Sequence, residues 1–287
     1  MSGLSKDKSV AIAKTIKLFI NGEFPRTESG RSFPVYFHSR PSEVYAHLCL
    51  ASRKDLRNAV SAAKKVQQSW SERSAYNRGQ ILYRIAEMIE ARRSEFVEIL
   101  NATQGMDAKK SEAELTGAIE AFVYFAGFTD KYEALIGSVN PVQGALTNST
   151  SVDAMGVVML VAGKGLAATC ADIAVSLCTG NSLVLLLDKK DAPLLASLAE
   201  CIATSDMPAG VVNILSGNLA ELAKVLAEHM EINTLSYQSE LDKNFYELKA
   251  NASDNLKRII APTKDKLSLN FLGQFVEFKT LWQTRGF

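Results

Sequence analysis

The sequence of 287 residues lacks the features that mark several classes of protein. No apolar run approaches the length of a membrane span, and the first residues have no apolar core followed by a cleavage site. Neither a membrane anchor nor a secretory signal is therefore expected. Internal repeats and low-complexity segments are also missing. The 32 basic and 31 acidic side chains leave a formal net charge of +1, which favours neither a nucleic acid nor a membrane as partner.

Histidine and cysteine are scarce, and their spacing gives no sign of a metal site. The histidines lie far apart, so neither metal ligation nor a catalytic triad is predicted. The cysteines have no Cys-x-x-Cys spacing, and three of them stand in apolar helical stretches, where a thiol behaves as a small hydrophobic group. We therefore expect reduced thiols and a cytoplasmic location. The residues are His38, His47, His229, Cys49, Cys170, Cys178 and Cys201.

The stretch from residue 156 to 217 carries the clearest pattern. Three short apolar, β-branched runs occur in it, at Val157–Ala162, Ser182–Leu187 and Val211–Leu215, separated by two spacers of helical length and Ala/Leu composition. Strands that are apolar throughout are expected where helices cover both faces of a parallel sheet. Gly180 and Gly210 end the spacers, where a left-handed residue is needed before the next strand. The pattern predicts an α/β fold.

Shorter signals flank this stretch. Asn21-Gly22 between apolar residues predicts a hairpin turn, and Ser52 with Asp55 predicts a capping box at the start of a helix. Further helices are expected over residues 75–100 and 109–126, and a strand near residues 44–50. From Phe275 onward the residues alternate as in a strand with one apolar-leaning face.

These motifs resemble the nicotinamide-binding domain of the aldehyde dehydrogenase superfamily. The most specific piece is PAGVVNILSG, supported by GVV, CTGNSLVLL and the FINGE hairpin near the start. The resemblance implies a Rossmann-like parallel sheet over residues 16–136 and 154–270. It also implies a small antiparallel oligomerisation arm over residues 137–153, completed by a final strand in residues 271–287. Residues 1–15 are expected to be flexible. The ending FKTLW is similar to the shortened C-terminal domain of the family-16 proteins, which is regarded as noncatalytic.

The catalytic groups implied by the resemblance are missing from their places. The family uses a cysteine nucleophile beyond the E-L-G-G-K strand, and no cysteine follows Pro262. Pro262 itself stands where the general-base glutamate belongs, and Gly163-Lys164-Gly165 stands where an asparagine would form the oxyanion hole. We therefore expect no catalytic residue and no catalytic domain.

The cofactor contacts implied by the resemblance are also altered. Leu186–Lys189 replaces the K-P-x-E motif that holds a ribose, and Ser236–Ser239 replaces the F-T-G-S turn near the pyrophosphate. No bound cofactor is expected, with NAD or NADP as the alternative. Vestigial contacts would come from Gly163, Lys164, Gly165, Ser216, Gly217 and Ser239.

Three functions remain open at this point. The first is a noncatalytic assembly partner that forms a homo-oligomer or a complex with a full-length aldehyde dehydrogenase. The second is a nucleotide-binding sensor, and the third is an NAD(P)-dependent aldehyde oxidoreductase or part of one. For assembly, the candidate contact residues on the arm and the final strand are Val139, Val142, Phe275, Phe278, Leu281 and Trp282.

Overall fold

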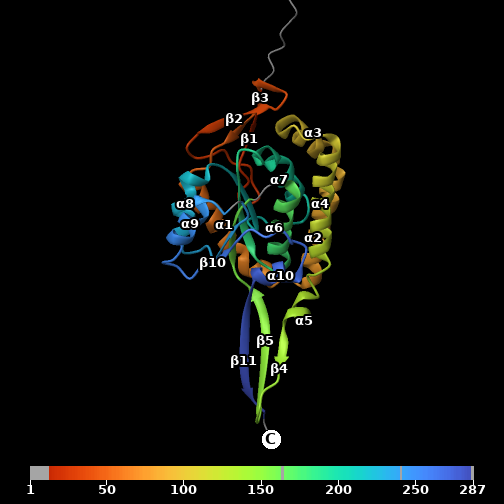
Figure 1. Ribbon diagram of the computed structural model, residues 1–287, viewed down its shortest axis with the longest axis vertical. Helices are drawn as coiled ribbons and strands as arrows, with labels where there is room; N and C mark the ends of the chain where they lie inside the picture. The colour runs from red at the N-terminus through yellow and green to blue at the C-terminus, as the bar shows by residue number, and fades with distance from the viewer. Residues whose placement is uncertain (1–12, 163–164, 240, 286–287) are drawn as a thin grey trace, which may run out of the picture.

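Figure 1 shows a computed structural model, which describes residues 13–162, 165–239 and 241–285. Its centre is a parallel sheet with the strand order β10-β9-β6-β7-β8. The three apolar runs of the sequence form three adjacent strands of this sheet, so the predicted α/β fold is confirmed. The strands are β6 (Val157–Val161), β7 (Ser182–Leu187), β8 (Val212–Ser216), β9 (Thr234–Tyr237) and β10 (Arg258–Ile260).

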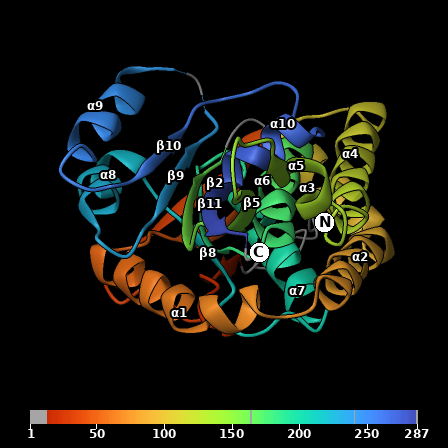
Figure 2. The same ribbon diagram turned by 90° about the horizontal axis from the view of Figure 1, so that it is seen from below.

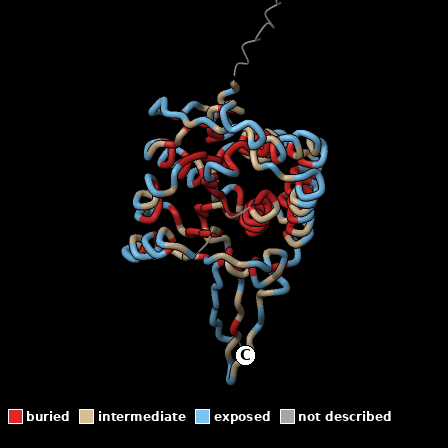
Figure 3. Tube along the Cα trace, turned by 45° about the horizontal axis from the view of Figure 1, so that its top comes forward, coloured by how far each residue is buried: buried red, intermediate tan, exposed pale blue. Residues whose placement is uncertain are grey.

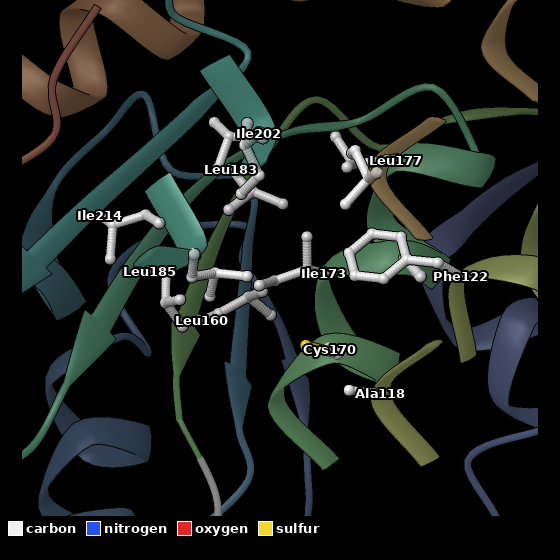
Figure 4. Packing of buried hydrophobic residues seen from close by; sticks show 14 of the residues in the cluster. Ala118, Phe122, Leu160, Cys170, Ile173, Leu177, Leu183, Leu185, Ile202 and Ile214 are labelled. Atoms are coloured by element: carbon white, nitrogen blue, oxygen red, sulfur yellow. The ribbon is translucent and has the colours of Figure 1, made fainter. Parts of the chain in front are cut away.

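Helices cover both faces of the sheet (Figure 2). Alternate residues of β6 and β7 enter two separate cores, one on each face. Leu183 and Leu185 of β7 pack on one face against Ile173 and Leu177, as Figure 4 shows, whereas Val184 points into the core on the other face. The helices on the first face are α2 (Ala75–Ala91), α4 (Ala108–Ala126), α6 (Leu166–Cys178) and α7 (Leu195–Ala203). Those on the second face are α1 (Arg53–Ser71), α8 (Leu219–Glu228) and α9 (Lys243–Asn251).

The predicted start of α1 is confirmed, but the long second helix is not. Ser52 and Asp55 form the expected reciprocal capping box. In place of one helix over residues 75–100, α2 ends before Arg92, whose φ of −107° and ψ of 19° are not helical, and α3 (Arg93–Gln104) follows. The Arg92 guanidinium pairs with Glu200 at this bend, and Phe96 of α3 is fully buried in the same core as α2. No glycine or proline marks the bend in the sequence, so the period of apolar residues did not reveal it.

A second sheet, with the order β1-β3-β2, is formed by the amino-terminal strands and lies at the upper end of the molecule in Figure 1. Asn21 and Gly22 both have positive φ and form the predicted tight turn, although only Ile20 and Glu23 are bridged across it. Residues 1–15 were expected to be flexible, and this is wrong for Lys14 and Thr15. Both belong to a strand that pairs in parallel with β3; residues 1–12 lie outside the described part. The strands are β1 (Lys14–Ile16), β2 (Ser32–Phe37) and β3 (Arg40–Cys49).

A three-stranded antiparallel sheet projects from the body (Figure 1), and most of its residues are exposed or half-buried (Figure 3). Its order is β11-β5-β4, and β11 pairs with β5 of the same chain from Val276 to Thr284. The strands are β4 (Ser138–Asn140), β5 (Leu146–Ala154) and β11 (Val276–Thr284). Short helical turns join this arm to the body: α5 (Tyr132–Ile136), α10 (Leu269–Leu272) and η2 (Gly273–Phe275). A further turn, η1 (Ala192–Leu194), lies between β7 and α7.

Within the part of the chain that the structure describes, every helix is too short or too polar to cross a lipid bilayer.

Candidate functional site

A cavity of about 380 Å³ opens at the carboxyl ends of the parallel strands. This is the edge at which open α/β sheets bind their ligands. Residues that follow β6, β7 and β8 line it together with the end of β9 and the start of α9. Its polar lining comes from Asp188, Lys189, Asn218, Ser239, Asp242 and Asn244, and Tyr237 and Leu186 add less polar surface.

The structure brings only part of the predicted cofactor set to this cavity. Gly217 and Ser239 line it. Ser216 does not, because its side chain is fully buried and its hydroxyl donates to the carbonyl of Cys49 at 2.6 Å. Gly165 caps the start of α6 with a φ of +95°. Gly163 and Lys164 lie outside the described residues.

A carboxylate of the chain itself occupies the amino terminus of α9. Asp242 accepts the Phe245 amide at 3.1 Å, the Tyr237 hydroxyl at 2.8 Å and the Asn244 side chain at 2.8 Å. Burial raises the pKa of Asp242, but these hydrogen bonds outweigh it and hold the pKa below its ordinary value. Burial and the same carboxylate raise the pKa of Tyr237 to about 12. The position that would favour a phosphate at this helix therefore holds a fixed negative charge.

The amino terminus of α6 is filled in a similar way. Glu114 of α4 accepts the Ala167 amide at 3.0 Å, and a Cβ on Gly165 would lie 2.7 Å from the same carboxylate. Asp191 lies close by, where Gln104 donates to it at 3.0 Å. Burial, with the nearby charge of Asp188, raises the pKa of Asp191, and a hydrogen bond from the Gly165 amide opposes the rise. Two helix starts at this edge thus carry carboxylates.

The carboxyl edge of the sheet offers partners for uncharged polar groups, and carboxylates stand at the helix ends that would bind an anion. Its polar side chains offer partners for hydroxyl and amino groups. A pyrophosphate, however, would meet Asp242 at α9 and Glu114 at α6, and each already accepts the backbone amides that would bind an anion. The residues that fill these helix ends were not singled out from the sequence. An aspartate directly before an amphipathic segment is an N-cap signal that could have identified Asp242.

All four cysteines are buried, and none lines the cavity. Burial raises the pKa of the Cys178 and Cys201 thiols to about 12 and moves that of Cys170 in the same direction. A thiol of this kind holds its proton at neutral pH and is a poor nucleophile. Among the described residues there is also no cluster of three His, Cys, Asp or Glu side chains that could hold a metal ion.

The residues predicted for assembly divide into two groups. Phe278, Leu281 and Trp282 of β11 are 51%, 55% and 59% exposed, Val139 of β4 is more exposed still, and Val142 is half-buried. Phe275 is wrongly placed in this set. It is fully buried against Phe271 in the core of the body, because the strand begins only after it at Val276.

Comparisons with known proteins agree with this architecture. The sequence model described as "Aldehyde dehydrogenase family" matches residues 25–263. "Aldehyde dehydrogenase family 2 member B4, mitochondrial" from Arabidopsis thaliana is 30% identical over 265 residues, which cover 88% of this chain and 47% of that protein. "Retinal dehydrogenase 2" from Homo sapiens is 29% identical over 261 residues, covering 86% and 48%.

Solved structures give the same result. An aldehyde dehydrogenase from Bacillus cereus matches with a TM-score of 0.80 at 26% identity and covers 86% of this chain and 50% of its own. The NAD+ complex of an aldehyde dehydrogenase from Bacillus cereus also matches with a TM-score of 0.80, at 25% identity. The chain spans about half the length of the relatives it matches. With the parallel sheet, its carboxyl-edge cavity and the projecting arm, these matches show that the chain belongs to the aldehyde dehydrogenase family.

Proposed function

We propose that this chain is a noncatalytic member of the family that acts as an assembly partner through its arm. The observation that carries the proposal is the set of exposed apolar side chains on β11, with Phe278 and Trp282 on one face of the strand and Leu281 on the other. Large apolar side chains exposed on an edge strand are unfavourable in water and are typical of surfaces that another chain covers. The partner is a second copy of the chain or a full-length aldehyde dehydrogenase.

The noncatalytic part of the proposal is supported by the thiols. Nucleophilic attack on an aldehyde by cysteine requires an accessible thiolate. Each cysteine of this sequence is buried, and burial raises the pKa of three of them. The proposal includes a cytoplasmic location, and neither a nucleic acid nor a membrane is among the partners.

Light scattering after size-exclusion chromatography tests the assembly function. The wild-type chain, alone or mixed with a full-length aldehyde dehydrogenase, is expected to elute as a complex. The double variant Phe278→Lys/Trp282→Lys is expected to elute as a monomer, because two charges on β11 oppose burial of the strand. Tyr76→Lys is the matched control, since Tyr76 is 71% exposed on the body and its replacement leaves the arm unchanged. A wild-type chain that stays monomeric in both experiments contradicts the proposal.

The carboxyl-edge cavity supports a second candidate, a sensor for a nucleoside or nucleotide. Titration calorimetry with adenosine, adenine nucleotides, NAD and NADP separates this function from pure assembly. Binding that Asp188→Ala weakens would support it, because Asp188 lines the cavity. The third candidate, aldehyde oxidation, requires NADH or NADPH production from an aldehyde. Turnover that persists after every cysteine is replaced would establish catalysis without a thiol nucleophile.

A further inference from the structure

We propose that β11 pairs antiparallel with β11 of a second copy of this chain, in a register centred on Thr280, so that the two arms form one continuous six-stranded sheet. This inference rests on the proposed assembly function and identifies the partner and the contact. It follows from which edge of the arm is open, how the charges of β11 are held, and which residues oppose each other in each register.

The arm has two outer strands, and only β11 offers a long edge. β4 has three residues, whereas β11 has nine and contains no proline. Among the described strands none pairs with the outer side of β11. Short edge strands are a usual protection against pairing with another chain, and β11 lacks this protection. Figure 1 shows its outer side facing away from the rest of the arm.

The charges on β11 are held by its own chain. Glu277 pairs with Arg258 at 2.7 Å, and Lys279 pairs with Asp153 of β5. A lysine on an edge strand usually hinders pairing because its charge would be brought against a partner strand. Here each charge on β11 lies beside an opposite charge, so the strand can approach another strand without an unpaired charge at its centre.

The two faces of the strand are of different character. Phe278, Thr280 and Trp282 lie on one face, where the Thr280 hydroxyl lies 3.0 Å from that of Thr150 on β5. Glu277, Lys279 and Leu281 alternate with them on the other face. An antiparallel pair related by a two-fold axis perpendicular to the sheet keeps each side chain on its own face. Residues that oppose each other across the pair must therefore point to the same face. This places the two-fold axis at one residue, which opposes the same residue of the second copy, and only a few registers are available.

The residues that oppose each other distinguish these registers. With the axis at Thr280, Phe278 lies opposite Trp282 of the second copy, and this aromatic pair occurs twice. Glu277 then opposes Gln283, and Lys279 opposes Leu281. With the axis at Lys279, two lysines oppose each other, which is unfavourable. With the axis at Leu281, Phe278 opposes Thr284 and both aromatic pairs are lost. Aromatic cross-strand pairs stabilise a sheet, so the register at Thr280 is the favoured one.

Thiol cross-linking tests the register. Thr280→Cys adds one exposed thiol to a chain whose own cysteines are all buried. In the proposed dimer the two introduced thiols oppose each other, and a short thiol-specific cross-linker should convert most of this variant to a covalent dimer. Thr284→Cys is the matched control on the same strand and face. Its two thiols would lie roughly 27 Å apart along the strands, so it should stay uncross-linked. Adding Phe278→Lys and Trp282→Lys to Thr280→Cys should abolish the cross-link.

The possible outcomes separate this inference from the assembly function. Equal cross-linking of the Thr280→Cys and Thr284→Cys variants, or cross-linking of the second alone, would overturn the register. A chain that is monomeric alone but binds a full-length aldehyde dehydrogenase would overturn self-pairing and leave the assembly function intact. A chain that does neither would overturn both. Cross-linking confined to Thr280→Cys supports the proposal.

Discussion

Lys266 and Asp172 form a salt bridge inside the body, between the segment that leads to the arm and helix α6. The Lys266 ammonium contacts both carboxylate oxygens of Asp172 at 2.7 Å, and the two side chains are 12% and 2% exposed. Burial raises the pKa of Asp172 from 3.8 to about 6, and Lys266 opposes the rise. The folded state thus holds this proton more tightly than the unfolded chain does. The Asp172 carboxyl therefore lowers the stability of the fold as the pH rises from about 4 to about 6.

Removal of Lys266 should expose the cost of that buried carboxylate. We expect Lys266→Ala to lower the free energy of unfolding by about 3–5 kcal/mol at pH 8, because an ionised carboxylate is left without its partner. The deficit relative to wild type should be smaller at pH 5 than at pH 8, because without Lys266 the Asp172 carboxyl of the variant takes up its proton at a higher pH than in wild type. Urea unfolding at pH 5 and pH 8 measures both values. Lys264→Ala, at an exposed position nearby, is the control and should change stability little. An equal deficit at both pH values would contradict the argument.

At the scale of single elements, the start of α9 determines which ligands the cavity can bind. Asp242 fills this helix end with a negative charge through its bonds to the Phe245 amide and the Tyr237 hydroxyl. Asp242→Ser keeps a side chain that can cap the helix and removes the charge. We expect the ratio of AMP affinity to adenosine affinity to rise about fivefold, since a charge at a helix terminus contributes about 1 kcal/mol. Titration calorimetry gives both affinities. An unchanged ratio would mean that Asp242 does not oppose the phosphate.

The elements also show what sequence reasoning can reach. β6, β7 and β8 were predictable because strands buried on both faces are apolar throughout, and the start of α1 was predictable because Ser52 and Asp55 form a local signal. The bend at Arg92 was not, since its guanidinium pairs with Glu200, which is far away in the sequence. The carboxylates at the helix starts near the cavity were not predictable either. Glu114 reaches the start of α6 only after α4 packs beside α6, and no spacing in the sequence records that contact.

For the whole molecule, the structure separates a well-buried body from an exposed arm (Figure 3). The cavity lies on the body, at the carboxyl edge of the parallel sheet, where Leu186, Asp188 and Asp242 line it. Mutations in the arm should therefore affect assembly without affecting the cavity, because the two regions share no lining residue.

The burial of all the thiols leads to a prediction for the intact fold. A catalytic cysteine reacts quickly with an alkylating reagent because its thiolate is accessible, whereas Cys49, Cys170, Cys178 and Cys201 are at most 3% exposed. We expect the native wild-type chain to bind no equivalent of a thiol reagent such as dithionitrobenzoate within minutes at pH 8. In denaturant all four should react, so the slow native reaction reports opening of the fold. The Tyr76→Cys variant is the control and should react with one equivalent at once, since Tyr76 is 71% exposed on the body, away from the arm. Rapid reaction of a wild-type cysteine would show an accessible thiol and would favour the catalytic alternative.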